Sequence, residues 1–228
     1  STAIPTKSQW LNLPRPVVRQ MAADVRHYHE LGIRKYLAQS GAAAWPTAGP
    51  LYYVTAKLLW NTKQDVESVI REWNQGMYGT AAGEMMAWYD AVEKVVAQSH
   101  GHYGGDPMRE VTNVYAPGCF TTAAKHLDRA LAAADGPAAK SRIGRVKSQF
   151  DYGVQGVDAI CCNAKWEESG DAAMLRQGQE AAKKLLAMKG IWNGVSMKHF
   201  QSYLEGLASV SAQGVRWQGF GKPEQKGG

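Results

Sequence analysis

The stretch GPLYYVTAKLLWNTKQDVESVIREWNQGMYG, which runs from Gly49 to Gly79, predicts two helices joined by a short turn. Pro50 suits a first helical position, because the N–H that proline lacks would have no partner at a helix start. Apolar residues then recur at helical spacing through both segments. Thr62, followed three residues later by Asp65, predicts a capping box for the second helix. Gly79 predicts its end. Two such helices need a partner surface, which the rest of the chain must supply.

The composition of the chain sets broad limits on its class. Its 228 residues suffice for one large domain or two small ones. No apolar run is long enough to cross a membrane. The net charge of +6 is spread along the sequence without a basic block, which favours a solvated surface over a nucleic-acid site. The three cysteines, Cys119, Cys161 and Cys162, do not make a disulfide framework, and the neighbours Cys161 and Cys162 are interpreted as small buried residues.

The segment before Gly49 predicts a helix, a strand and a loop. Pro16 opens the helix, which runs to about Leu31 and is ended by Gly32. The strand is Ile33–Gln39. Since no second strand of similar quality follows, its backbone groups would lack partners within the chain. We therefore expect it to pair outside the helical bundle, with a separate part of a longer protein, a second copy, or residues 1–13.

The segment after Gly79 predicts further helices, which makes the fold mainly α, an antiparallel helical bundle. Apolar residues at helical spacing predict helices over about 80–99, 119–135, 143–166, 171–190 and 196–208. Residues 100–118 are predicted to be a long connector, and 219–228 a disordered tail. The expected core residues are Leu58, Trp73, Tyr89, Phe150 and Leu185.

Three stretches together resemble a bacterial family. RHYHELGIRKYLAQSG (26–41) precedes LYYVTAKLLWNTKQDVESVIREWNQGMYGTAAGEMMAWYD (51–90), and HLDRALAAADGPAAKSRIGRVKSQFDY (126–152) follows. Their order is similar to the C-terminal half of a domain of unknown function that occurs in glycoside hydrolases with a barrel catalytic core. Some members are endo-β-N-acetylglucosaminidases acting on complex N-glycans. The resemblance covers about residues 20–165.

The resemblance implies that Ile33–Gln39 is the last strand of a (β/α)8 barrel and that Ser40–Gly49 is the loop on its active face. Residues 1–48 would then be a terminal barrel-like segment, and 49–228 a helical domain. The catalytic carboxylates of such enzymes come from earlier strands, so the catalytic residues are unassigned and the isolated chain is expected to be inactive. The resemblance also suggests a secreted or periplasmic protein, whose partner would be the missing barrel portion or a second copy.

Three residues at the end of the strand and in the loop are candidates for binding a glycan. Trp45 could stack its flat ring on a sugar face, or it could pack against the following helix beside Pro46. Gln39 and Ser40 could hydrogen-bond sugar hydroxyls, or they could merely end the strand. His100, His102 and Asp106 form a loose cluster, but the glycines around them argue against a rigid metal site. No metal and no cofactor are therefore predicted.

Three functions remain open from the sequence. The first is the non-catalytic C-terminal portion of a glycoside-hydrolase-like protein acting on glycans, among them glycans that contain N-acetylglucosamine. The second is a helical module that binds carbohydrate or protein without catalysis. The third is nucleic-acid binding through the scattered positive charge.

Overall fold

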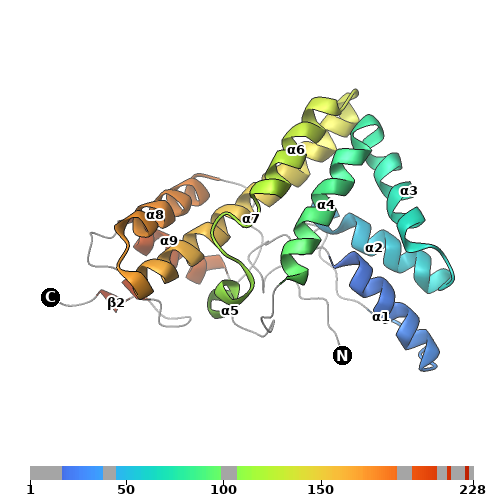
Figure 1. Cartoon of the computed structure of the whole chain (residues 1–228), viewed down its shortest axis with the longest axis horizontal. Helices are drawn as coiled ribbons and strands as arrows, with labels where there is room; N and C mark the ends of the chain where they lie inside the picture. The colour runs from blue at the N-terminus through green and yellow to red at the C-terminus, as the bar shows by residue number, and fades with distance from the viewer. Residues whose placement is uncertain are drawn as a thin grey trace. The chain divides into compact units, whose positions relative to one another are not determined.

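A computed structural model describes residues 17–37, 45–98, 107–188, 197–209, 215–216 and 224–225 (Figure 1). The helices are α1 (Val18–Glu30), α2 (Trp45–Trp60), α3 (Val66–Tyr78), the 3-10 turn η3 (Gly79–Ala81), α4 (Ala82–Ala97), α5 (Pro107–Val114), α6 (Thr121–Ala133), α7 (Pro137–Ser169), α8 (Ala172–Ala187) and α9 (Met197–Ser209). The two-residue strands β1 (Val215–Arg216) and β2 (Glu224–Gln225) pair antiparallel. The prediction of a mainly α fold is confirmed, and the described part of 50–208 contains no strand.

The chain forms two compact units. Unit 1 holds α1 to α4, α6 and the first part of α7, and unit 2 holds α5, the rest of α7, α8, α9 and the strand pair. The predicted domain boundary at 48/49 falls inside α2. Strand β2 lies in the stretch that the sequence predicts to be a disordered tail.

Unit 1 has an apolar core in which α1, α2 and α3 meet. The buried residues of this cluster are Val18, Met21, Ala22, Val25, Leu51, Val54, Leu58, Val69 and Ile70. Four of the five predicted core residues are buried, with Leu58, Tyr89 and Phe150 in unit 1 and Leu185 in unit 2. Trp73 is only half-buried, and its ring lies against Gly49 of α2, where a Cβ atom would overlap it.

The predicted strand Ile33–Gln39 is wrong in its described part. Residues 33–37 are neither helix nor strand and are exposed, and Leu37 exposes 97% of its surface. Ile33 instead continues the hydrogen bonds that end α1, with its N–H donating to Tyr28 O over 2.9 Å. Residues 38 and 39 lie outside the described part of the chain.

The predicted loop Ser40–Gly49 is also wrong where it is described, because α2 begins at Trp45 rather than at Pro50. Pro46 sits in the first turn, where a missing N–H costs little. Pro50 lies inside the helix and removes one backbone bond, which a helix with a buried apolar face tolerates.

The helix starts differ from the prediction in three places. Asp65, not Thr62, is the N-cap of α3, and its carboxylate accepts the Ser68 N–H over 2.8 Å. The helix predicted over about 80–99 begins at Ala82, because Thr80 lies in the 3-10 turn η3, where its hydroxyl donates to Ala133 O over 2.7 Å. The predicted connector 100–118 contains α5 in its described part.

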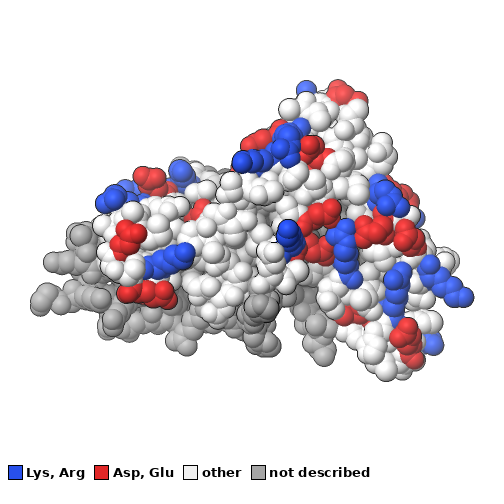
Figure 2. Space-filling model, viewed as in Figure 1, with Lys and Arg blue, Asp and Glu red and all other residues white. Residues whose placement is uncertain are grey.

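Charged side chains tie the helices of unit 1 together at the surface. Basic and acidic residues lie beside one another over the face in view (Figure 2). Arg19 of α1 pairs with Glu67 of α3 at 2.7 Å and with Asp90 of α4 at 2.9 Å. Glu84 of α4 accepts from Arg129 of α6 over 3.0 Å and lies 2.7 Å from Nδ1 of His126. Contacts with His126 and then Arg129 lower the pKa of the Glu84 carboxyl.

Replacing Glu84 with glutamine should therefore destabilise the protein in a pH-dependent way. A carboxyl whose folded-state pKa is lowered contributes stability above its unfolded pKa and loses it as the pH falls through the folded value. We expect E84Q to melt at a lower temperature than the parent at about pH 7, and the difference in melting temperature to shrink as the pH is lowered and the folded state takes up the proton. The exposed Glu168 supplies the control, and E168Q should melt like the parent throughout this pH range.

Candidate functional site

The site residues predicted from the sequence do not come together in the described structure. Gln39 and Ser40 lie outside the described residues, as do His100, His102 and Asp106. Trp45 is the first residue of α2, so it belongs to a helix and not to a loop, and its side chain is not described. Their binding roles stay predictions.

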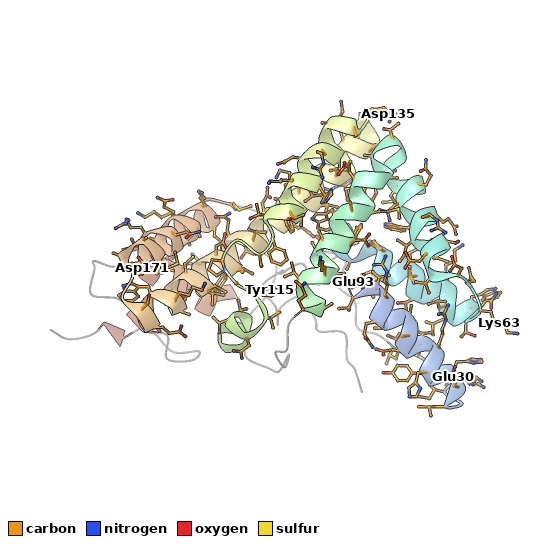
Figure 3. All side chains as sticks on the ribbon, in the orientation of Figure 1. Glu30, Lys63, Glu93, Tyr115, Asp135 and Asp171 are labelled. Atoms are coloured by element: carbon orange, nitrogen blue, oxygen red, sulfur yellow. The ribbon has the colours of Figure 1, made fainter. Side chains whose placement is uncertain are left out.

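A cavity of about 250 Å³ lies at one end of unit 1, between the ends of α1 and α2. It is lined by Val25, Tyr28, His29, Ile33, Arg34, Lys35, Tyr36, Leu59 and Thr62, and we call it the α1–α2 cleft. The labelled residues Glu30, which ends α1, and Lys63, in the turn after α2, mark this end of the unit (Figure 3). Three segments of chain therefore build one site.

The first wall of the cleft is the C-terminal end of α1, which closes in a Schellman motif. The Gly32 N–H donates to His29 O over 3.1 Å, and the Ile33 N–H donates to Tyr28 O. Gly32 has a φ of 84°, a conformation that glycine adopts without steric cost. The motif also sets Ile33 beside Tyr28, the apolar pair that such ends commonly bring together. Both side chains line the cleft.

The second wall is the segment 33–36, which turns back toward α1. The Tyr36 hydroxyl lies 3.7 Å from the sulfur of Met21, a residue in the first turn of α1. Nη1 of Arg34 donates to His29 O over 2.7 Å and to Ile33 O over 3.1 Å. These bonds hold the segment against α1 without a partner strand.

The third wall is the end of α2 and the turn that follows. Arg26 of α1 donates through Nε to Thr62 O over 3.1 Å and through Nη2 to Gln64 O over 2.7 Å. Gln64 in turn donates to Lys57 O over 2.7 Å. Because one guanidinium holds two carbonyls of the turn, Leu59 and Thr62 are kept in position opposite α1.

The chemistry of the cleft combines aromatic rings with basic and hydroxyl groups. Burial, followed by the nearby Tyr28 and Asp24, raises the pKa of the Tyr36 phenol, so it stays protonated and able to donate. His29, Arg34 and Lys35 supply nitrogen donors, and none of the nine lining residues is Asp or Glu. The cleft can therefore bind a polar molecule with an apolar face, and its lining supplies no carboxylate for acid–base chemistry.

Large apolar side chains are exposed around the same end of unit 1. They are Leu31, Ile33, Tyr36, Leu37, Leu59 and Trp60, and Trp60 exposes 92% of its surface. Three of the six also line the cleft. Several exposed apolar residues at one place are typical of a binding surface. Sequence reasoning missed this site, although the mixture of aromatic and basic residues in RHYHELGIRKY was a signal for it.

Other reactive groups in the described structure serve packing. The thiols of Cys119, Cys161 and Cys162 are free, and burial raises their pKa values to about 11, about 12 and about 11, so they are protonated near neutral pH. Cys161 and Cys162 are buried, which confirms their interpretation as small core residues. Among the described residues, no cluster of three His, Cys, Asp or Glu side chains could hold a metal ion. No described helix is both long and apolar enough to cross a membrane.

Comparison with known proteins gives one match. A family profile with the description "Domain of unknown function (DUF4838)" matches residues 6–90. This stretch contains all nine residues of the α1–α2 cleft. The match supports the resemblance to a domain of unknown function, and the description names no activity and no ligand. No curated protein and no solved structure matches the chain.

Proposed function

We propose that this chain is a non-catalytic, carbohydrate-binding part of a protein that acts on glycans, and that the α1–α2 cleft receives the sugar. The observation that carries the proposal is the lining of the cleft, in which Tyr28 and Tyr36 stand beside the Thr62 hydroxyl and three basic side chains. A sugar ring has apolar faces and a rim of hydroxyls. Aromatic groups surrounded by hydrogen-bonding side chains suit both features.

The size of the cleft favours a short segment of a glycan. Its volume of about 250 Å³ lies just below the range of about 300–1,000 Å³ typical of pockets for drug-sized ligands. One sugar ring, at the end of a chain or branching from it, is the occupant that this volume favours.

The absence of a carboxylate from the lining supports binding without hydrolysis at this cleft. Glycosidases ordinarily need two carboxylates beside the scissile bond, or one acid assisted by the N-acetyl group of the substrate. The nine lining residues include neither Asp nor Glu. Action on N-acetylglucosamine-containing glycans by a longer glycoside-hydrolase-like protein rests on the resemblance over residues 20–165 alone.

A second candidate function is a module that binds another protein through the exposed apolar side chains at this end of unit 1. The exposure of Leu37 (97%) and Trp60 (92%), beyond the cleft itself, favours it. A protein partner would cover these residues, whereas a single sugar ring in the cleft would leave them in solvent.

Removing one ring from the cleft should separate the two candidates. We expect Tyr36→Ala to weaken the binding of soluble oligosaccharides by about tenfold or more, because it deletes an aromatic wall of the cleft. Tyr36→Phe keeps the ring and should bind nearly as the parent does. Leu37→Ala, in the neighbouring exposed residue that does not line the cleft, is the matched control. The measurement is an NMR titration of backbone amides 25–36 and 59–62 with a panel of oligosaccharides.

Two results would contradict the proposal. The first is that no saccharide in the panel shifts these amides. The second is that Leu37→Ala weakens saccharide binding as much as Tyr36→Ala does, which would mean that the saccharide does not sit in the α1–α2 cleft. Robust release of product from chromogenic N-acetylglucosaminides or a complex N-glycan would contradict the non-catalytic part alone.

A further inference from the structure

Two cationic side chains of the α1–α2 cleft are without an ion-pair partner among the described residues. Arg34 and Lys35 line the cleft and form no ion pair with any described carboxylate. Asp24 lies near Tyr36 on the α1 side, but it does not line the cleft and it accepts a hydrogen bond from Gln20 over 2.8 Å.

Basic side chains elsewhere in unit 1 are of both kinds, since Lys63, Lys94 and Lys125, for example, form no ion pair with a described carboxylate. Those with a carboxylate partner are Arg19, Lys57, Arg71, Arg129 and Lys147. What distinguishes Arg34 and Lys35 is their place, because two adjacent cationic side chains that line one cleft without a described carboxylate partner favour a negatively charged ligand there.

The Arg34 guanidinium is held so that one edge stays open. Its Nη1 atom donates to the carbonyls of His29 and Ile33, as described above. Its Nε and Nη2 atoms form no hydrogen bond with another described residue. These two atoms can donate in parallel to the two oxygens of a carboxylate or to two oxygens of a sulfate. Because Nη1 already fixes the group, less side-chain freedom is lost on binding.

We propose that the α1–α2 cleft selects a sugar that carries an acidic group, a uronic acid or a sulfated sugar, and that Arg34 binds this group. The inference rests on the proposed carbohydrate function and names its ligand class. Lys35 adds a second positive charge at the same wall, and Tyr28, Tyr36 and Leu59 face the apolar side of the ring. A free inorganic anion would contact Arg34 and Lys35 but would make no use of the apolar surface of Tyr28, Tyr36 and Leu59.

The test compares matched neutral and acidic sugars on the intact chain. The probes are D-glucose, D-glucuronic acid and D-glucose 6-sulfate, with D-galactose and D-galacturonic acid as a second pair, and sodium acetate and sodium sulfate as free anions. Titration of the amides around the cleft, at one ionic strength, should give at least one acidic sugar an affinity about tenfold above its neutral counterpart. The difference should shrink as salt is raised.

The variants should remove the preference for the acidic sugar while leaving the fold intact. R34Q should abolish it and K35Q should reduce it, whereas R176Q, in the exposed Arg176 of α8, should leave it unchanged. R34K keeps the charge but not the two-pronged geometry, so it should retain part of the preference. Lys35 forms no hydrogen bond with a described residue, so K35Q tests the charge without disturbing the bonds that hold the segment.

The outcomes separate this inference from the proposed function. If neutral and acidic sugars bind equally, or if R34Q weakens both alike, the selection of an acidic group is wrong while carbohydrate binding stands. If acetate or sulfate binds as tightly as the matching acidic sugar, the site takes anions only and the inference fails. If no sugar of either charge binds, the proposed function itself fails.

Discussion

Replacing Trp88 with alanine is expected to lower the free energy of unfolding by about 3–5 kcal/mol, the range for deleting a large buried aromatic side chain. Trp88 is fully buried in unit 1, with 0% of its surface exposed. Its ring lies edge-to-face against Phe150 with centroids 5.5 Å apart, and its centroid is 4.5 Å from that of Tyr89. Phe150 packs in turn on Phe120 at 5.6 Å.

This arrangement favours the upper part of that range. Edge-to-face pairs contribute about 0.5–1.5 kcal/mol beyond the area that they bury. Alanine would remove two such contacts and leave a cavity among rings that are too stiff to fill it. Equilibrium unfolding in denaturant measures the loss, provided that the slope of the transition stays the same as in the parent.

Two further variants make the measurement specific. Trp60→Ala removes the same side chain from a site where it is 92% exposed, and should change stability by about 0.5 kcal/mol or less. Trp88→Phe keeps a ring in the core. The indole N–H of Trp88 meets no acceptor among the described residues, so phenylalanine forfeits no hydrogen bond there and should cost less than alanine. If W88A lowers the free energy of unfolding as little as W60A does, Trp88 is not part of the core of unit 1.

The sequence predicts the helices of this chain well because their signals are local. Asp171 stands at the predicted start of a helix, and its carboxylate accepts the Ala173 N–H over 2.8 Å. Gly32 and Gly79 end their helices with φ values of 84° and 53°. Each of these features needs only the residues of one turn.

The core was predicted less completely because a single apolar stripe describes only one contact face. The stripe of α4 gives Tyr89 but omits Trp88, the next residue back, which lies on a different side of the helix. In the structure α4 contacts both α3 and α6, so both residues are buried. Trp73 shows the opposite error, since a residue on a predicted stripe is only half-buried where its helix meets Gly49.

The candidate site could not be predicted because it depends on contacts between distant residues. Tyr36 and Leu59 line one cleft only because Arg26 holds the turn after α2 while the end of α1 directs residues 33–36 back toward Met21. A glycine such as Gly32 indicates that a helix ends, but it does not indicate the direction of the residues that follow. The strand predicted for Ile33–Gln39 is wrong in its described part because the sequence does not show that residues 33–36 fold back against α1.

In unit 2 the largest expected effect comes from Leu185→Ala, which should cost about 2–5 kcal/mol. Leu185 of α8 is fully buried, and α8 approaches α7 so closely that a Cβ atom added at Gly178 would lie 3.3 Å from Cβ of Cys162 and 3.4 Å from the backbone nitrogen of Asn163. Helices already in backbone contact cannot move together to fill a cavity, so the loss of unfolding free energy should fall in the upper half of the range.

The adjacent Leu186 is only half-buried, and Leu186→Ala should cost about 1 kcal/mol or less. Equal losses at the two positions, measured by unfolding in denaturant, would contradict the orientation of α8 against α7.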